Sequence, residues 1–144
     1  IDLLYEAEAD IDSLGKVLYG GPMMGISVYS LDDPILKNTN ALTCLNEKDS
    51  RPKAQNPCIH CGKCVSACPM GLMPTVFAKA MNVDAAEERA ARLTTSKINL
   101  CIECGCCSFV CPSARPLVET NRLAKADLRE YSSKNQAKKE EAKK

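Results

Sequence analysis

The sequence CIHCGKCVSACP at residues 58–69 decides how this chain of 144 residues is organised, because it recurs as CIECGCCSFVCP at residues 101–112. Both copies follow the pattern C-x2-C-x2-C-x3-C-P. Three thiolates at this spacing can wrap one metal centre from a short loop, while the fourth leaves the loop just before a proline. The duplication therefore indicates two related metal centres built from one stretch of chain.

The same spacing is the ligand run of proteins with two [4Fe-4S] clusters, in which the fourth cysteine of each run binds the other cluster. A glycine beside the middle cysteine of each copy, Gly62 or Gly105, lets the backbone approach the cluster closely. We therefore predict two clusters with ligands that cross between the runs. Cluster I takes Cys58, Cys61, Cys64 and Cys111, and cluster II takes Cys101, Cys104, Cys107 and Cys68.

A zinc-stabilised interaction module is the alternative interpretation, because C-x2-C pairs also form closed four-cysteine zinc sites. Such sites combine two pairs across a longer loop and do not need a third and fourth cysteine at this spacing. The duplicated run favours iron–sulfur clusters, and a colourless, air-stable protein that contains zinc would favour the alternative.

Composition limits the remaining possibilities. The chain has no Trp, two Phe and four Tyr, so a conventional core would be thin and the clusters would act as covalent staples. Eight of its ten cysteines lie in the runs, and thiolate ligands need a reducing compartment. A net charge of +1 gives no argument for nucleic-acid binding. No stretch approaches the roughly 20 apolar residues that span a bilayer, so we expect no direct membrane span.

The region before the first run is expected to contain short strands. Residues 1–14 look like the end of a helix followed by a polar turn, which suggests a part excised from a longer protein. Strands are expected at 16–19 and 26–29, joined by the turn GGPMMG, and a weaker one at 35–45. Within that last segment, Cys44 is expected to be a buried thiol. GGPMMG matches no phosphate-binding fingerprint, and its proline removes a backbone donor.

The region from the linker onward is expected to be helical. Residues 46–57 are polar and predict a linker, and 32 residues separate Cys68 from Cys101. One helix is predicted to start at Pro74, and a second to open with a capping box at 84–87 and run to about Leu93. A last helix follows Pro116, and its buried stripe is expected to comprise Leu117, Val118, Leu123, Ala124 and Leu128.

These segments predict a mainly α fold class. An α-helical ferredoxin domain with two [4Fe-4S] clusters would occupy residues 58–131, after a small β-containing segment at 1–45 and the linker at 46–57. Residues 132–144 are charged and lack hydrophobic periodicity, so we expect a solvated tail, disordered or a frayed helix.

The chemistry expected of this segment is electron transfer. No nucleophile–base pair, carboxylate dyad or nucleotide fingerprint is evident, so we assign no catalytic residue. One electron would enter one cluster, pass to the other and leave to a partner. His60 is expected to be an exposed neighbour of the first cluster, and Cys106 a thiol beside the second.

Three motifs together resemble RnfC, a component of the Rnf electron-transport complex. They are GGPMMG, CIHCGKCVSACPMGLMP and CIECGCCSFVCPSARPLVETNRLAK, and the resemblance extends from about Leu14 to Lys125. It implies a cytoplasmic subunit, peripheral on the inner membrane face, of a complex that exchanges electrons between ferredoxin and NAD and couples this to Na⁺ or H⁺ translocation. The expected partners are the other subunits of the complex and ferredoxin or flavoprotein redox partners.

The resemblance also implies that further domains precede this segment. In whole members of the family, an FMN- and NADH-binding region and a ubiquitin-like β-grasp (SLBB) domain come before the ferredoxin part. Residues 1–45 would be the end of that SLBB region, and FMN and NAD would bind only upstream. The family's cluster ligands fall on the eight cysteines chosen by spacing. A ferredoxin-like subunit of a cobalamin reductase or of another dehydrogenase is the alternative within the same class.

Overall fold

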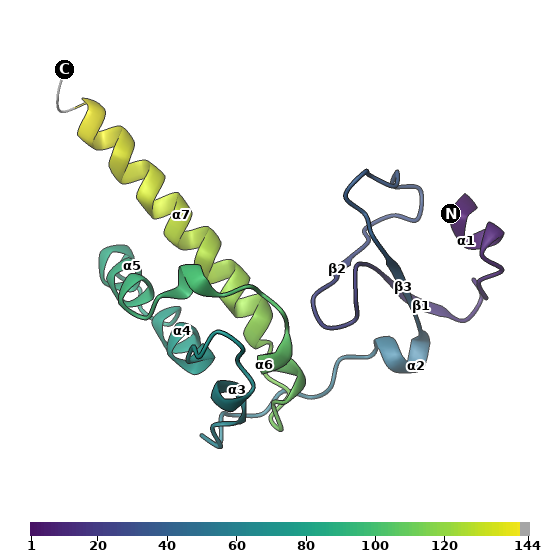
Figure 1. The fold of residues 1–144 in the computed structure, drawn as a ribbon, viewed down its shortest axis with the longest axis horizontal. Helices are drawn as coiled ribbons and strands as arrows, with labels where there is room; N and C mark the ends of the chain where they lie inside the picture. Colours follow the sequence, from purple (N-terminus) through teal and green to yellow (C-terminus); the bar gives the residue numbers. More distant parts are fainter. Residues whose placement is uncertain (142–144) are drawn as a thin grey trace. The chain divides into compact units, whose positions relative to one another are not determined.

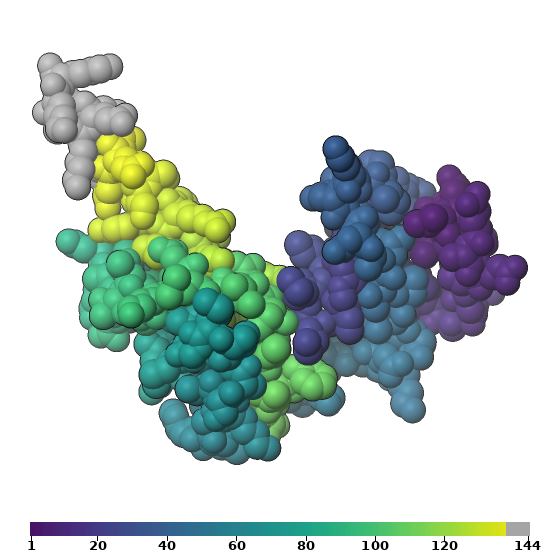
Figure 2. Space-filling model, viewed as in Figure 1, coloured from purple at the N-terminus to yellow at the C-terminus, as the bar shows by residue number. Residues whose placement is uncertain are grey.

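The computed structural model describes residues 1–141. Within it the chain divides into two compact units, Ile1–Ala54 and Gln55–Lys144, and each unit is considered by itself (Figure 1, Figure 2). The first unit contains a small sheet, and the second contains both cysteine runs.

The N-terminal unit is built on a three-stranded antiparallel sheet in the order β2-β1-β3. The turn GGPMMG joins β1 to β2, as predicted, because Tyr19 pairs with Ile26 on either side of it. Val17 and Leu18 of the central strand are buried. The elements are α1 (Asp2–Glu6), β1 (Leu14–Tyr19), β2 (Ile26–Ser27), β3 (Leu42–Asn46) and α2 (Glu47–Ser50).

Two details of this unit differ from the sequence expectations. Cys44 is exposed rather than buried, because β3 is an edge strand and leaves this thiol uncovered. The segment 46–57, expected to be a linker, begins with the short helix α2, whose first turn is capped when Asn46 Oδ1 accepts from Asp49 N at 2.8 Å. No regular element is assigned between Arg51 and Gly62.

The C-terminal unit contains helices and, within residues 55–141, no strand. Its core is formed by Phe77, Leu93, Ile98 and Ala124, all fully buried. The chain therefore combines a helical cysteine-bearing unit with a small sheet. The elements are α3 (Lys63–Ser66), α4 (Pro74–Ala80), α5 (Ala86–Thr95), the 3-10 helix η1 (Ile98–Leu100), α6 (Cys106–Phe109) and α7 (Leu117–Glu141).

Helix α4 begins at Pro74 as predicted, but the expected capping box of α5 does not form. Helix α5 starts one residue later than that box requires, so Ala85 is its N-cap and no side chain caps it. Instead, the Arg89 guanidinium donates to the carbonyl oxygens of Val83 at 2.8 Å and Asp84 at 3.3 Å. These bonds hold the turn that enters the helix.

The buried stripe of α7 was predicted correctly at four of its five positions. Leu117, Val118, Ala124 and Leu128 are buried, whereas Leu123 is 65% exposed. A step of one residue turns a helix by about 100°, so Leu123 lies on a different face from its neighbour Ala124. The interior position one turn before Ala124 is occupied by Asn121 instead, which is 1% exposed.

Helix α7 also continues beyond Tyr131 into the segment expected to be a charged tail. Residues 132–141 are helical, and residues 142–144 lie outside the described part. The segment is rich in Lys, Glu, Gln and Ala, which are good helix formers. An exposed ion pair one turn apart, Lys134 with Glu130, adds local support.

Candidate functional site: two cysteine pockets

The two cysteine runs fold alike. Each has a short helix, α3 or α6, that starts after a glycine in the left-handed region, Gly62 at φ 77° and Gly105 at φ 80°. His60 and Glu103 also occupy equivalent left-handed positions, at φ 56° and 57°. Positive φ is uncommon for such residues, so its repetition at matched positions shows that both loops adopt one conformation.

Each run places its first three cysteines around one pocket and its fourth cysteine at the other pocket. The volumes are about 210 Å³ for the first pocket and about 20 Å³ for the second. The first pocket is lined by Cys58, Cys61, Cys64 and Cys111. The second is lined by Cys68, Cys101, Cys104 and Cys107, together with the additional thiol of Cys106.

The third cysteine of each run is the most enclosed of its group. Cys64 and Cys107 are 8% and 7% exposed, and they pack with Leu117 and Val118 at the start of α7. Burial raises the pKa of the Cys64 thiol, and it raises the pKa of Cys107 to about 11. Metal binding would therefore have to displace a tightly held proton from each thiol.

The second pocket contains hydrogen-bond donors directed at its sulfurs. The backbone N–H of Leu72 donates to Cys68 Sγ at 3.4 Å, and Asn121 Nδ2 donates to Cys101 Sγ at 3.7 Å. Cys106 lies beside Cys104, whose hydrogen bond raises the pKa of the Cys106 thiol. Cys106 thus lines the pocket of the second run, as expected from its position.

Side chains of α7 hold the loop of the second run in place. Lys125 Nζ donates to the Cys101 carbonyl oxygen at 3.0 Å and to Glu103 Oε1 at 2.6 Å. Arg122 Nε lies 3.3 Å from Glu103 Oε2. Hydrogen bonding from Lys125 lowers the pKa of the Glu103 carboxyl. Sequence analysis missed Asn121 and this ion-pair group, although the helical spacing of Asn121 and Lys125 places them on one face of α7.

The donor set of each pocket fits a [4Fe-4S] cluster, which takes four cysteine thiolates. Four thiols line each pocket, and the left-handed glycines open each loop without a side chain. Within the described residues, no three His, Cys, Asp or Glu side chains converge closely enough to share a single metal ion.

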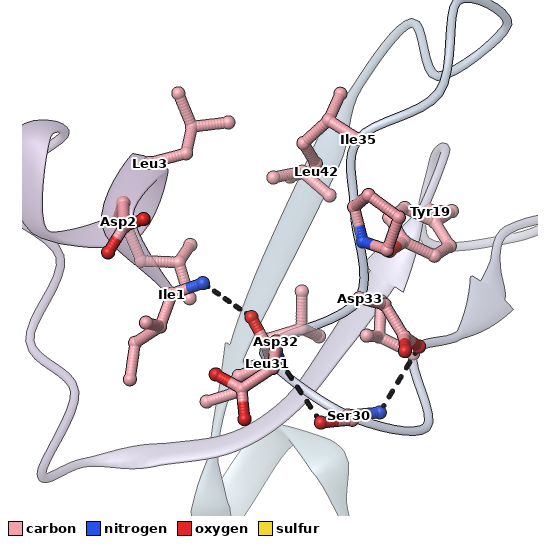
Figure 3. A pocket seen from close by; sticks show the side chains of 14 residues that line it. Ile1, Asp2, Leu3, Tyr19, Ser30, Leu31, Asp32, Asp33, Ile35 and Leu42 are labelled. Atoms are coloured by element: carbon pink, nitrogen blue, oxygen red, sulfur yellow. Dashed lines mark hydrogen bonds between the residues drawn. The ribbon is translucent and has the colours of Figure 1, made fainter.

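A third pocket, of about 420 Å³, lies in the N-terminal unit between α1 and the sheet (Figure 3). Its lining combines apolar side chains such as Leu3 and Leu42 with the carboxylates of Asp2, Asp32 and Asp33. The Ile1 amino group donates to the Leu31 carbonyl at its rim. No cysteine lines this pocket, and it carries no part of the site described above.

Residues 57–114, which contain both runs, match the family described as 4Fe-4S dicluster domain. The class defined by this site is therefore an iron–sulfur electron-transport domain of the 4Fe-4S type. Within that class, the resemblance to RnfC is confirmed over the cysteine-bearing part, where the chain is similar to the RnfC-type components of ion-translocating oxidoreductase complexes.

Three such relatives illustrate the similarity. The chain is 43% identical over 65 residues to the RnfC-type component of the Na⁺-translocating ferredoxin:NAD⁺ oxidoreductase complex of Acetobacterium woodii. It is 40% identical over 62 residues to the proton-translocating counterpart of Clostridium ljungdahlii, and 40% identical over 60 residues to the corresponding component of the ion-translocating oxidoreductase complex of Methanosarcina acetivorans. The matched segments are 45%, 43% and 42% of this chain, but only 15%, 14% and 13% of the relatives.

The helices of the structure are too short or too polar to span a membrane. Among the described residues, no helix combines the length and the apolar character needed to cross a bilayer.

Proposed function

We propose that the eight cysteines hold two [4Fe-4S] clusters with ligands that cross between the runs. Cys111 lines the pocket of the first run and Cys68 that of the second, which is the observation that carries the assignment. Cluster I would bind to Cys58, Cys61, Cys64 and Cys111, and cluster II to Cys101, Cys104, Cys107 and Cys68.

The spread of the thiols supports clusters over zinc. Four thiolates around one zinc ion all lie about 2.3 Å from the same atom, whereas a cubane carries each thiolate on a different iron. In the described part of the chain the thiols surround pockets, and no three converge on one point. This arrangement suits a polynuclear cluster, and it assigns the helical unit to the α-helical ferredoxin type.

The function that follows is electron transfer as part of a membrane-associated complex. A [4Fe-4S] cluster supplies a one-electron redox centre when bound. Relatives similar over the same residues are named as components of ferredoxin:NAD⁺ oxidoreductase complexes that translocate Na⁺ or protons. By analogy, this chain would carry electrons between ferredoxin and NAD within such a complex, coupled to translocation of one of these ions.

The remaining features of the proposal follow from the same analogy. The chain would be a cytoplasmic subunit, peripheral on the inner membrane face, in contact with other subunits and with ferredoxin or flavoprotein partners. FMN and NAD would bind to sequence upstream of this segment. Residues 1–45 would be the end of an SLBB region, with the linker at 46–57 and the ferredoxin domain at 58–131.

The ligand assignment can be tested with cysteine-to-alanine variants of the full chain, reconstituted anaerobically and examined by EPR after reduction. Cys61→Ala and Cys104→Ala serve as references, because each removes a ligand from the middle of one run. The spectrum of Cys68→Ala should match that of Cys104→Ala, since both variants remove a ligand of cluster II.

The reciprocal variant gives the matched control. Cys111→Ala should match Cys61→Ala, because both remove a ligand of cluster I. If Cys68→Ala instead reproduced the spectrum of Cys61→Ala, each run would bind its own cluster and the crossed assignment would be wrong.

A further inference from the structure

Asn121 is a polar side chain in the buried stripe of α7. It is 1% exposed and continues the face formed by Leu117, Ala124 and Leu128. A buried amide without its hydrogen bonds destabilises a fold by about 1–3 kcal/mol, and a leucine of similar size would avoid this cost. Its Oδ1 has no hydrogen-bond partner among the described atoms. A buried asparagine kept at such a cost requires a specific reason.

The amide of Asn121 points into the pocket of the second cysteine run. Nδ2 lies 3.7 Å from Cys101 Sγ, and Asn121 is itself part of the pocket lining. A thiolate bound to iron can only accept a hydrogen bond, so the NH₂ end of the amide must be the end that faces the sulfur. The chemistry of the acceptor thus fixes the orientation of the side chain.

The loop that carries Cys101 is held at this distance by a second contact from the same helix. Lys125, one turn after Asn121, donates to the Cys101 carbonyl oxygen at 3.0 Å and to Glu103 at 2.6 Å. The Lys125 side chain is only 13% exposed. Helix and loop are therefore joined on both sides of the N–H···S contact, which limits how far they can separate.

The first run lacks this donor. Asn121 and Ala78 each lie ten residues after the fourth cysteine of their runs, Cys111 and Cys68. Ala78 packs against the buried group that includes Cys64, but its methyl side chain has no N–H to give. The two sites, otherwise alike in backbone, thus differ at this position by one hydrogen-bond donor.

We propose that Asn121 is a positioning residue that raises the reduction potential of the cluster bound at the second run by donating an N–H···S hydrogen bond to Cys101. The inference rests on the proposed function, because it requires a cluster in that pocket. Hydrogen bonds to the sulfurs are among the determinants of cluster potential. Reduction adds negative charge, so a donor stabilises the reduced state more than the oxidised one.

The test is an EPR-monitored redox titration of the reconstituted full chain, for the natural sequence and for Asn121→Leu. The variant removes the donor at similar volume. We expect the potential of the second cluster, identified by the signal that Cys104→Ala loses, to fall. A tenfold change in the ratio of oxidised to reduced cluster is the expected scale, or about 59 mV for a one-electron couple. The potential of the first cluster should stay unchanged.

Two further variants separate tuning from general damage. Asn121→Ala reproduces the residue found at the matching position of the first run and should lower the same potential. Thr120→Val is the control, because Thr120 Oγ1 donates only to Pro116 O within α7, at 2.8 Å, and both potentials should stay as in the natural chain.

Unchanged potentials in both Asn121 variants would overturn the proposal, as would equal shifts of both clusters. Loss of the second cluster in both variants would assign Asn121 a purely structural role and would also overturn it. Failure of the proposed function would look different, because the natural chain itself would then show no reducible cluster.

Discussion

Gly15 lies at an irregularity in the pairing of β1 with β3, where the register shifts between Leu14 and Lys16. A Cβ at this position would lie 2.6 Å from Glu47 Cα and 2.7 Å from Asn46 O, which are backbone atoms of the junction between β3 and α2. Contacts this short force the backbone to move. Only glycine therefore allows α2 to pack directly on β1.

Gly15→Ala should destabilise the N-terminal unit by about 1–3 kcal/mol, the usual cost of overpacking. The measurement is hydrogen–deuterium exchange of the paired β1 and β3 amides, which should lose protection. Gly21→Ala is the matched control, because a Cβ there meets nothing within 4 Å. Equal protection in Gly15→Ala and the natural chain would show that α2 does not pack on β1 as described.

Single residues differ in how far the sequence predicts them. The cysteines and Gly62 and Gly105 could be assigned because metal ligation and left-handed backbone each restrict the residue types allowed. Asn121 could not, because a polar residue on a helix normally indicates the solvent face, and only the packed structure shows that it faces Cys101.

At the scale of elements, α7 is joined to α5 by a two-armed ion pair. Arg89 donates to both carboxylate oxygens of Asp127, at 2.8 Å and 2.9 Å, while a third nitrogen contacts Val83 O. The two side chains are 18% and 29% exposed. Partial burial and paired geometry make this bond stronger than an ordinary surface ion pair.

Asp127→Asn should lower the free energy of unfolding by about 1–3 kcal/mol near neutral pH, because it leaves Arg89 without its anionic partner. Thermal unfolding followed by circular dichroism measures the loss. Glu88→Gln is the control. Its ion pair with Arg92 is 54% exposed on both sides, so removing it should change stability by less than about 1 kcal/mol.

The effect of Asp127→Asn should also depend on pH. Hydrogen bonding from Arg89 lowers the pKa of Asp127 in the folded state. Its contribution is therefore complete above the unfolded value of about 3.9 and is lost as the pH falls through the lower folded value. The stability difference between the natural chain and the variant should shrink below about pH 3.9. A difference that stays constant with pH would contradict the ion pair.

The existence of elements was more predictable than their ends and faces. The duplicated runs, the turn GGPMMG and the start of α4 at Pro74 follow from local chemistry, and the structure contains them. The capping box of α5 and the exposure of Leu123 depend on tertiary contacts, here those of Arg89 and of Asn121. Helix propensity in the charged segment after Tyr131 was outweighed in the prediction by the absence of apolar periodicity.

At the scale of the whole molecule, the division into two units predicts a site of limited proteolysis. Residues 51–57 are exposed and have no assigned helix or strand, and the boundary between the units follows Ala54. Trypsin should cut first after Lys53, because Arg51 is followed by proline. Mass spectrometry should detect residues 54–144 as a stable product that keeps its iron.

Lys53→Gln tests whether this site controls the cleavage. The variant should resist the first cut without a change in iron content, since Lys53 lies outside both cysteine pockets. Early cleavage inside α4 or α5 instead would mean that the helical unit does not fold as a compact body.

The central claim is that the chain binds two four-iron clusters, and metal content tests it most directly. Anaerobically purified full chain should contain about eight irons and about eight sulfides, and the reduced protein should show EPR signals from two interacting centres. Stoichiometric zinc without iron, sulfide or visible absorption would contradict the account and would make the two cysteine pockets structural sites.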